Sequence, residues 1–184
     1  MATQYVPLSP VDLLPEELQI DKPSETPEVV YADDPATYGM VDFSHEEPVT
    51  VEENTTVDKA SSMSRKIKAH DLLILDEEQQ LCGILHSADL EGVRPTQIME
   101  SKDIEKSEVT VGMLMTPLDE VLCLNYDEIL HARIGNLIAS LNQQRCEYAL
   151  AIDSDKDSGQ QTVRGLISKW RLTHQLGEES NKKS

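Results

Sequence analysis

Gly83-Ile84-Leu85-His86-Ser87-Ala88-Asp89 has a counterpart later in the chain, Gly165-Leu166-Ile167-Ser168-Lys169-Trp170-Arg171, at an offset of 82 residues. Upstream, residues 72–76 (LLILD) match residues 149–153 (ALAID) at an offset of 77, and residues 41–51 match residues 113–123 at an offset of 72. Two insertions of five residues account for the drift between these offsets. Solenoid proteins need three or more repeats, so a single duplication of this length predicts one domain built from two similar halves.

Each half is predicted to run strand, helix, strand, strand, helix. Apolar runs such as residues 72–75, bounded by Asp71 and Asp76, are typical of buried strands. The expected strands are 49–51, 72–75, 81–85, 121–124, 148–152 and 163–167, and the expected helices are 54–68, 87–91, 127–142 and 168–176. Asp127 is expected to cap the third helix, and Pro95 to interrupt the helical segment after residue 91.

One half cannot cover both faces of its three strands. Two halves packed sheet to sheet, with their helices outside, can do so. The sequence therefore predicts an α/β fold of the α+β type, with two pseudo-symmetric motifs.

The chain carries a formal charge of −18 over 184 residues. Residues 1–48 contain eleven acidic groups and a single basic one, Lys22. Because nucleic acid is bound through clustered Lys and Arg, neither nucleic acid nor an anionic membrane surface is an expected partner. The one basic cluster, Arg65-Lys66-Lys68, is most simply interpreted as the solvated face of a helix.

The three cysteines, Cys82, Cys123 and Cys146, are odd in number and far apart, which indicates reduced thiols rather than a disulfide framework. With no apolar run long enough to span a bilayer and no signal-peptide pattern at Met1, a cytoplasmic location is expected. The sequence has no nucleophile motif, phosphate-binding glycine loop or zinc-binding His spacing, so we expect neither catalysis nor a metal site.

Six of the nine prolines lie in residues 1–40, where acidic groups also repel one another. Proline fixes φ and lacks an amide donor, so residues 1–39 are expected to form a mostly disordered acidic arm. Within it, residues 11–18 are the stretch suited to docking as one helical turn. The other expected segments are the first motif at 40–108, the second motif at 109–177 and a polar tail at 178–184.

The duplicated order of elements, Met115-Thr116-Pro117 ahead of the second copy and the closing pattern Gly-apolar-x-Ser/Thr-x-x-Asp together resemble a tandem pair of cystathionine-β-synthase (CBS) domains. The resemblance covers residues 40–177. It implies two such motifs packed sheet to sheet, commonly as a homodimer. It also implies a regulatory module, since many of these pairs bind adenine nucleotides in the clefts between their halves.

The resemblance implies a ligand cleft around Asp89. A carboxylate at the start of a helix can accept hydrogen bonds from ribose hydroxyls, and the helix N-terminus suits a phosphate. The residues assigned to this cleft are His86, Ser87, Asp89, Met115, Thr116, Pro117, Tyr148 and Ala149. His86 replaces the hydroxyl residue of the pattern, and the nearest basic residue, Arg94, is more distant along the chain.

A mirror cleft would combine Ser44, Asp71, Ser168 and Arg171. Arg171 replaces the carboxylate and cannot accept from ribose, so this cleft is expected to be empty or to bind an anion differently. Local roles stay open: Asp89 can cap its helix, Arg171 can pair with a neighbouring carboxylate, and His86 can be a satisfied histidine at the rim.

These features predict a non-catalytic sensing module that binds an AMP-like nucleotide and signals to a partner protein, with AMP, ADP and ATP as candidate ligands and no required cofactor. AMP is favoured because basic residues near Asp89 are few. The alternative is a structural adaptor or dimerisation protein that keeps the CBS fold without ligand binding.

Overall fold

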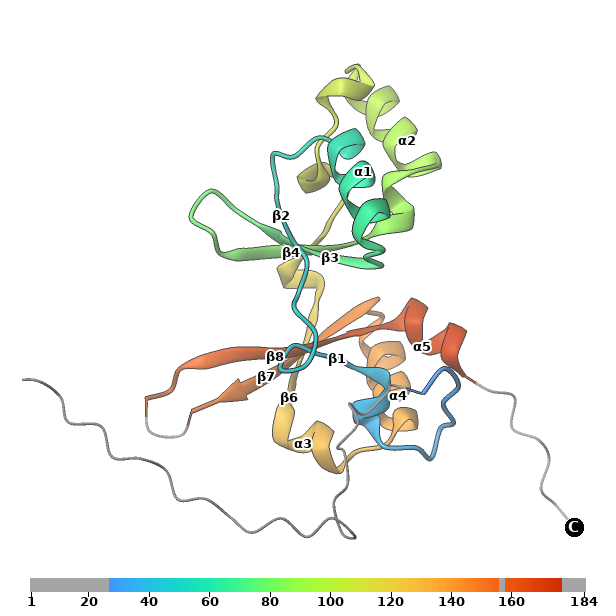
Figure 1. Ribbon diagram of the computed structural model, residues 1–184, viewed down its shortest axis with the longest axis vertical. Coiled ribbons are helices and arrows are strands. Elements are labelled where there is room, and N and C mark those ends of the chain that lie inside the picture. The colour runs from blue at the N-terminus through green and yellow to red at the C-terminus, as the bar shows by residue number, and fades with distance from the viewer. Residues whose placement is uncertain (1–26, 156–157, 177–184) are drawn as a thin grey trace, which may run out of the picture.

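Two four-stranded sheets face each other in the computed structural model, and helices cover their outer faces (Figure 1). The structure describes residues 27–155 and 158–176. The strands are β1 (Val41–Asp42), β2 (Thr50–Glu52), β3 (Asp71–Leu75), β4 (Leu81–His86), β5 (Thr116–Pro117), β6 (Leu122–Asn125), β7 (Tyr148–Ser154) and β8 (Gln161–Ser168). The α-helices are α1 (Val57–Ile67), α2 (Val93–Lys102), α3 (Tyr126–His131), α4 (Ile134–Gln144) and α5 (Lys169–Gln175). Short 3₁₀ turns are η1 (Ala36–Gly39), η2 (Ser87–Leu90), η3 (Lys106–Glu108), η4 (Val111–Met113) and η5 (Leu118–Glu120). The predicted fold class, with its sheet-to-sheet packing, is confirmed.

The central hairpins of the two halves have the same register. The matching pairs are Leu72–Leu85 and Ile74–Gly83 in the first sheet, and Ala149–Ile167 and Ala151–Gly165 in the second. Both hairpins also shift register at the same step, after Ile74 and after Ala151. The offsets of 77 and 82 are therefore confirmed.

Each sheet is completed by a short strand from the segment that precedes the other half. β1 pairs with β8, and β5 pairs with β4, so the strand orders are β1-β8-β7-β6 and β2-β3-β4-β5. The offset of 72 is wrong for this segment, because it aligns Val41 with Met113. In the structure Val41 lies opposite Leu166, and Thr116 lies opposite Ile84, the counterpart of Leu166.

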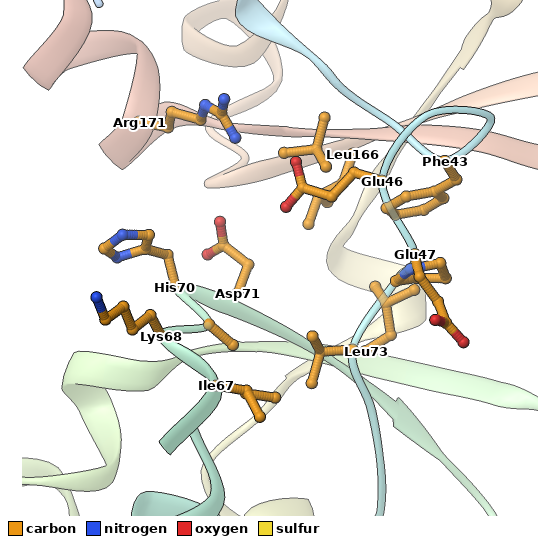
Figure 2. A pocket seen from close by; sticks show the side chains of 14 residues that line it. Phe43, Glu46, Glu47, Ile67, Lys68, His70, Asp71, Leu73, Leu166 and Arg171 are labelled. Atoms are coloured by element: carbon orange, nitrogen blue, oxygen red, sulfur yellow. The ribbon is translucent and has the colours of Figure 1, made fainter. Parts of the chain in front are cut away.

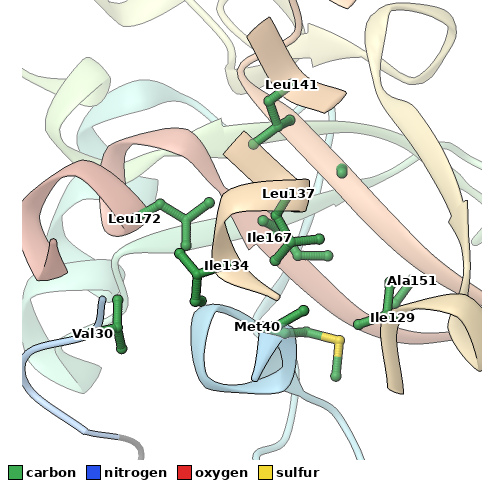
Figure 3. Packing of buried hydrophobic residues seen from close by; sticks show 11 residues of the cluster. Val30, Met40, Ile129, Ile134, Leu137, Leu141, Ala151, Ile167 and Leu172 are labelled. Carbon is green, nitrogen blue, oxygen red and sulfur yellow. The ribbon is translucent and has the colours of Figure 1, made fainter. Parts of the chain in front are cut away.

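Three apolar layers hold the fold together. The layer between the sheets contains Leu73, Ile84, Val121, Tyr148, Leu150 and Leu166. Behind the second sheet, Val30, Ala36 and Met40 pack against residues of α4 and α5 (Figure 3). Behind the first sheet, Val109, Val111 and Leu114 pack against Val57 and Leu72. Each preceding segment thus supplies part of the opposite half's core, and a boundary at residue 108 divides the sequence but not the cores.

Residues 27–39 are packed against the second half, contrary to the expected disordered arm. Val30 and Ala36 are fully buried, and the Val30 amide donates to the Gln175 carbonyl at 2.8 Å. Pro35 does not prevent this packing, because it precedes η1 where its fixed φ of −53° fits the turn. The remaining arm, including residues 11–18, and the tail at 178–184 lie outside the described residues.

The helix expected over residues 127–142 is two helices, α3 and α4. The break is filled by the segment before β1: the Ile134 amide donates to the Asp34 carbonyl, and the Gly135 amide to the Ala32 carbonyl, both at 2.9 Å. These carbonyls satisfy donors at the start of α4 that a continuous helix would have bonded internally. Local periodicity cannot reveal acceptors that lie about a hundred residues upstream.

Two helix starts also differ from expectation. Asn125, not Asp127, caps α3, since its side-chain oxygen accepts from the Asp127 amide at 2.8 Å. Pro95 lies in the first turn of α2, where its missing amide is not needed, so the helix begins at Val93.

The longest described helices have 11 residues, and none combines the length and apolarity needed to cross a bilayer.

Candidate functional site

A cavity of about 240 Å³ lies between the two halves, at the place of the predicted mirror cleft (Figure 2). The first half contributes the end of α1 and the start of β3, and the second half contributes β8 and α5. The segment after β1 closes the remaining side. Its lining includes Phe43, Glu46, Glu47, Lys68, Asp71 and Arg171.

Cations enter this cavity from both halves. Arg171 reaches in from α5, and Lys68 lies on the facing wall at the end of α1 (Figure 2). Glu46, Glu47 and Asp71 supply three carboxylates against these two cations. Apolar surface comes from Phe43 and neighbouring strand residues. The cavity thus offers an apolar wall, an anion-binding group on each side and a net negative balance.

Asp71 is not free to act alone, because it is paired with His86. The His86 Nδ1 lies 3.0 Å from an Asp71 carboxylate oxygen, and both side chains are about nine-tenths buried. The hydrogen bond to Asp71 raises the pKa of His86, burial opposes that shift, and the charges of Asp71 and Asp89 add to it. His86 is therefore a satisfied histidine between the halves, one of the local roles left open by the sequence.

The two serines predicted for the mirror cleft have local partners. The Ser44 hydroxyl donates to an Asp42 carboxylate oxygen at 2.6 Å. Ser168 is buried and caps α5, where its hydroxyl accepts from the Arg171 amide at 3.5 Å. Of the four residues predicted there, the structure brings Asp71 and Arg171 to the cavity wall.

Asp89 forms an ion pair with Arg94, the residue that the sequence placed farther away. One Arg94 nitrogen donates to the Asp89 carboxylate at 2.8 Å, and another donates to the Leu114 carbonyl at 2.8 Å. The contact arises because η2 ends at Leu90 and Gly92, at φ 112°, turns the chain directly into α2. Arg94 therefore ties Asp89 to the segment that leads into β5.

The other residues predicted around Asp89 divide between the two faces of the sheets. Tyr148 is buried in the layer between the sheets, where burial raises its pKa and the charges of Asp71 and Asp89 raise it further. Ala149 faces the helical layer, as alternation along a strand requires, so only its backbone is available to a cleft. Met115 also packs on the helical side, next to the Cys82 thiol.

Backbone hydrogen bonds hold three further predicted residues, two in β5, the strand that the segment before the second half adds to the first sheet, and one at the start of η2. Thr116 and Pro117 form β5 and pair with Ile84 and Gly83. The Ser87 amide donates to the His70 carbonyl at 2.7 Å, which joins the start of η2 to the loop before β3. The backbone bonds of Thr116, Pro117 and Ser87 thus hold the exchanged strand β5 and the start of η2 against the first sheet.

Sequence reasoning missed the aromatic cluster around Trp170. The Trp170 ring lies 4.4 Å from the His86 ring and 4.0 Å from the His174 ring, with His70 at 5.8 Å. These rings come from both halves, so a side chain at the second position of α5 contacts the first sheet. The only sequence signal was that Trp170 is the single tryptophan, within the closing pattern of the second copy.

No protein-family model and no curated protein sequence matches the chain. Solved structures do. An uncharacterized conserved protein from Pyrococcus horikoshii matches with 14% identity over 78% of this chain and 92% of that chain, at a TM-score of 0.50. The CBS domain of a bacterial CNNM/CorC family Mg²⁺ transporter matches with 14% identity over 77% of this chain and 74% of that chain, also at 0.50. A structure of CBSX2 in complex with AMP matches with 19% identity over 77% and 93%, at 0.47.

Three observations point to the same fold: the exchange of β1 and β5 between the sheets, the matched registers of the two hairpins, and the similarity to the transporter's CBS domain. The chain has the fold of a tandem CBS domain pair.

Proposed function

We propose that this chain is a non-catalytic regulatory module that binds an AMP-like adenine nucleotide between its two halves. The observation that carries the proposal is the cavity at their seam, to which each half contributes one cation, Lys68 and Arg171. Among the described residues, no carboxylate pairs with either side chain, whereas Lys106, Arg65, Arg94 and Lys169 all have carboxylate partners. Unpaired cations facing a cavity in an acidic protein favour an anionic ligand.

The size and charge of the cavity favour a monophosphate. Its volume of about 240 Å³ lies below the roughly 300–1,000 Å³ typical of drug-sized ligands. Three carboxylates also line it, so each added phosphate would meet more repulsion than attraction. Phe43 offers a flat apolar surface for a base. AMP fits this combination better than ADP or ATP.

A second nucleotide site is proposed in the cleft around Asp89. There the carboxylate would accept from ribose hydroxyls, and Arg94, which already contacts it, would lie near the phosphate. Tyr148 would border the base from the layer between the sheets. Binding in this cleft requires the ion pair between Asp89 and Arg94 to adjust.

The proposed mechanism is a shift in population. A ligand that contacts both halves stabilises the arrangement it fits best and cannot favour any other. Because the exchanged segments link the halves, a change at the seam would reach the outer helices, where a homodimer partner or another protein could respond. The partner protein stays open.

Binding can be tested by thermal unfolding with adenosine, AMP, ADP and ATP. AMP is expected to raise the unfolding midpoint most, and at 100 times its dissociation constant it should add about 2.7 kcal/mol to the free energy of unfolding. Arg171→Ala should weaken binding in the cavity, and Asp89→Ala should weaken binding in the other cleft. Lys102→Ala removes an exposed cation far from the seam and serves as the control.

The alternative is an adaptor that keeps the fold without a ligand. The closing pattern favours this adaptor, because neither copy has a free carboxylate at its last position. Arg171 replaces the carboxylate in the second copy, and Asp89 in the first copy forms an ion pair with Arg94. No shift of the unfolding midpoint with any of the four compounds would support the adaptor and refute the nucleotide proposal.

A further inference from the structure

Two basic residues end the first long helix of each half in the left-handed conformation. Lys68 follows α1 with φ 56° and ψ 35°, and Arg145 follows α4 with φ 58° and ψ 33°. A Cβ disfavours this conformation, so glycine is the usual residue at such a helix end. Neither half uses glycine here, and strain retained at matching positions points to a role for the side chains.

The two positions are structurally equivalent. The residue after each cap donates to the carbonyl five residues back, Ala69 to Ser64 and Cys146 to Leu141, both at 3.0 Å. Two residues after each cap, a carbonyl accepts from the start of the last helical segment, as the His70–Ser87 and Glu147–Lys169 bonds show. Lys68 lines the cavity (Figure 2). The equivalence of the two positions assigns Arg145 to the proposed cleft around Asp89.

No contact with another described side chain accounts for the choice of Lys68 or Arg145 at these positions. Lys68 and Arg145 are both exposed, and within the described ranges neither side chain has a hydrogen bond or ion pair. A third helix end, at Asp103, has the same left-handed geometry, but aspartate tolerates it better than residues with long side chains. Asp103 ends α2, away from the cavity lining, and therefore provides a matched control.

We infer that Lys68 and Arg145 are the phosphate-binding cations of the two clefts, one in each, and this inference rests on the proposed function. In the cavity, Lys68 and Arg171 line the space from opposite halves, so a phosphate monoester held there would contact both. In the other cleft, Arg145 would share the phosphate with Arg94. Each half would thus supply one helix-end cation to one of the two clefts. This role would account for the left-handed backbone strain that is retained at both positions.

The test combines stability with affinity for AMP and for adenosine. Lys68→Gly and Arg145→Gly should raise the unfolding midpoint without ligand, because glycine adopts the left-handed conformation freely. The same variants should weaken AMP binding, each at one cleft, by about tenfold, the loss expected for one charge-assisted hydrogen bond. Adenosine binding should be unchanged. Lys68→Gln should weaken AMP binding while leaving the midpoint unchanged.

Asp103→Gly should raise the midpoint with no effect on AMP. If Lys68→Gly and Arg145→Gly behave like Asp103→Gly, the two cations have no ligand role and the inference is overturned, while AMP binding by the unaltered chain would leave the proposed function intact. If the unaltered chain binds neither AMP nor adenosine in calorimetric titration, the proposed function itself fails.

Discussion

Trp170 joins the two halves through its side chain. Its ring lies against His86 of the first half, and His86 in turn is hydrogen-bonded to Asp71. The chain has no other tryptophan, so its fluorescence reports on this seam alone. The contact also places an ionisable group with a raised pKa beside the fluorophore.

The His86–Asp71 pair should make stability depend on pH near neutrality. The folded pKa of His86 is raised above its ordinary value of 6.5, mainly by the hydrogen bond to Asp71. Its contribution to stability is therefore fully present below about pH 6.5 and is lost as the pH rises through the raised folded pKa. Urea unfolding from pH 5.5 to 8.5 should show this decline, and His86→Gln should flatten it. An equal slope in both proteins would mean that another group is responsible.

The candidate site was predictable where the closing pattern names its residues. Asp89 and Arg171 occupy the last position of the pattern in the two copies, whereas Asp71 was assigned to the mirror cleft through the family resemblance. Lys68 was interpreted as a solvated helix face, because a sequence window does not show that the chain turns left-handed there. The contact of Arg94 with Asp89 was missed for a similar reason, since it depends on the turn at Gly92.

The glycine that opens the closing pattern, Gly83 in β4 and Gly165 in β8, leaves room for the backbone of the neighbouring strand. A Cβ on Gly165 would lie 2.5 Å from the Val41 carbonyl oxygen, and one on Gly83 would lie 2.8 Å from the Thr116 carbonyl oxygen. In both cases the close neighbour is the backbone of the exchanged strand. Glycine is required because another main chain approaches closely.

Gly83→Ala and Gly165→Ala should therefore each destabilise the fold by about 1–3 kcal/mol, the cost typical of overpacking. Gly135→Ala is a suitable control, because its Cβ would meet the Ala32 carbonyl oxygen at a milder 3.3 Å and alanine favours helix. Chemical denaturation measures all three. A Gly165→Ala protein as stable as the unaltered chain would contradict the close approach of β1 to β8.

The elements themselves were largely predictable. The hairpins followed from apolar runs at equal offsets, and their registers agree residue by residue. The predicted helix bounds were wrong where backbone from a distant part of the sequence bonds to the helix. α3 and α4 form one continuous pattern in the sequence, and they are separated by carbonyls of Ala32 and Asp34. The exchange of β1 and β5 was missed because two-residue strands have no periodicity.

At the scale of the whole molecule, the exchange makes the halves interdependent. Val30 and Met40 complete the core of the second half, whereas Val111 and Leu114 complete that of the first. Between the sheets, a third apolar layer joins both halves. Neither core can form fully from one half's own residues, so the two should unfold together.

Val30→Ala and Val111→Ala test this interdependence. Both valines are fully buried, and each substitution should cost about 2 kcal/mol. Trp170 fluorescence and far-ultraviolet circular dichroism should report one shared midpoint in both variants, lowered by similar amounts. If Val111→Ala shifts the dichroism midpoint and leaves the Trp170 midpoint unchanged, the halves unfold independently.

The placement of β1 beside β8 also has a consequence for the nascent chain. Val30 and Met40 are among the first described residues to leave the ribosome, yet Ile167 and Leu172 of the same apolar cluster are among the last described residues to be synthesised. These early apolar side chains stay uncovered until the second half has emerged, a period in which they are accessible to chaperones and to aggregation.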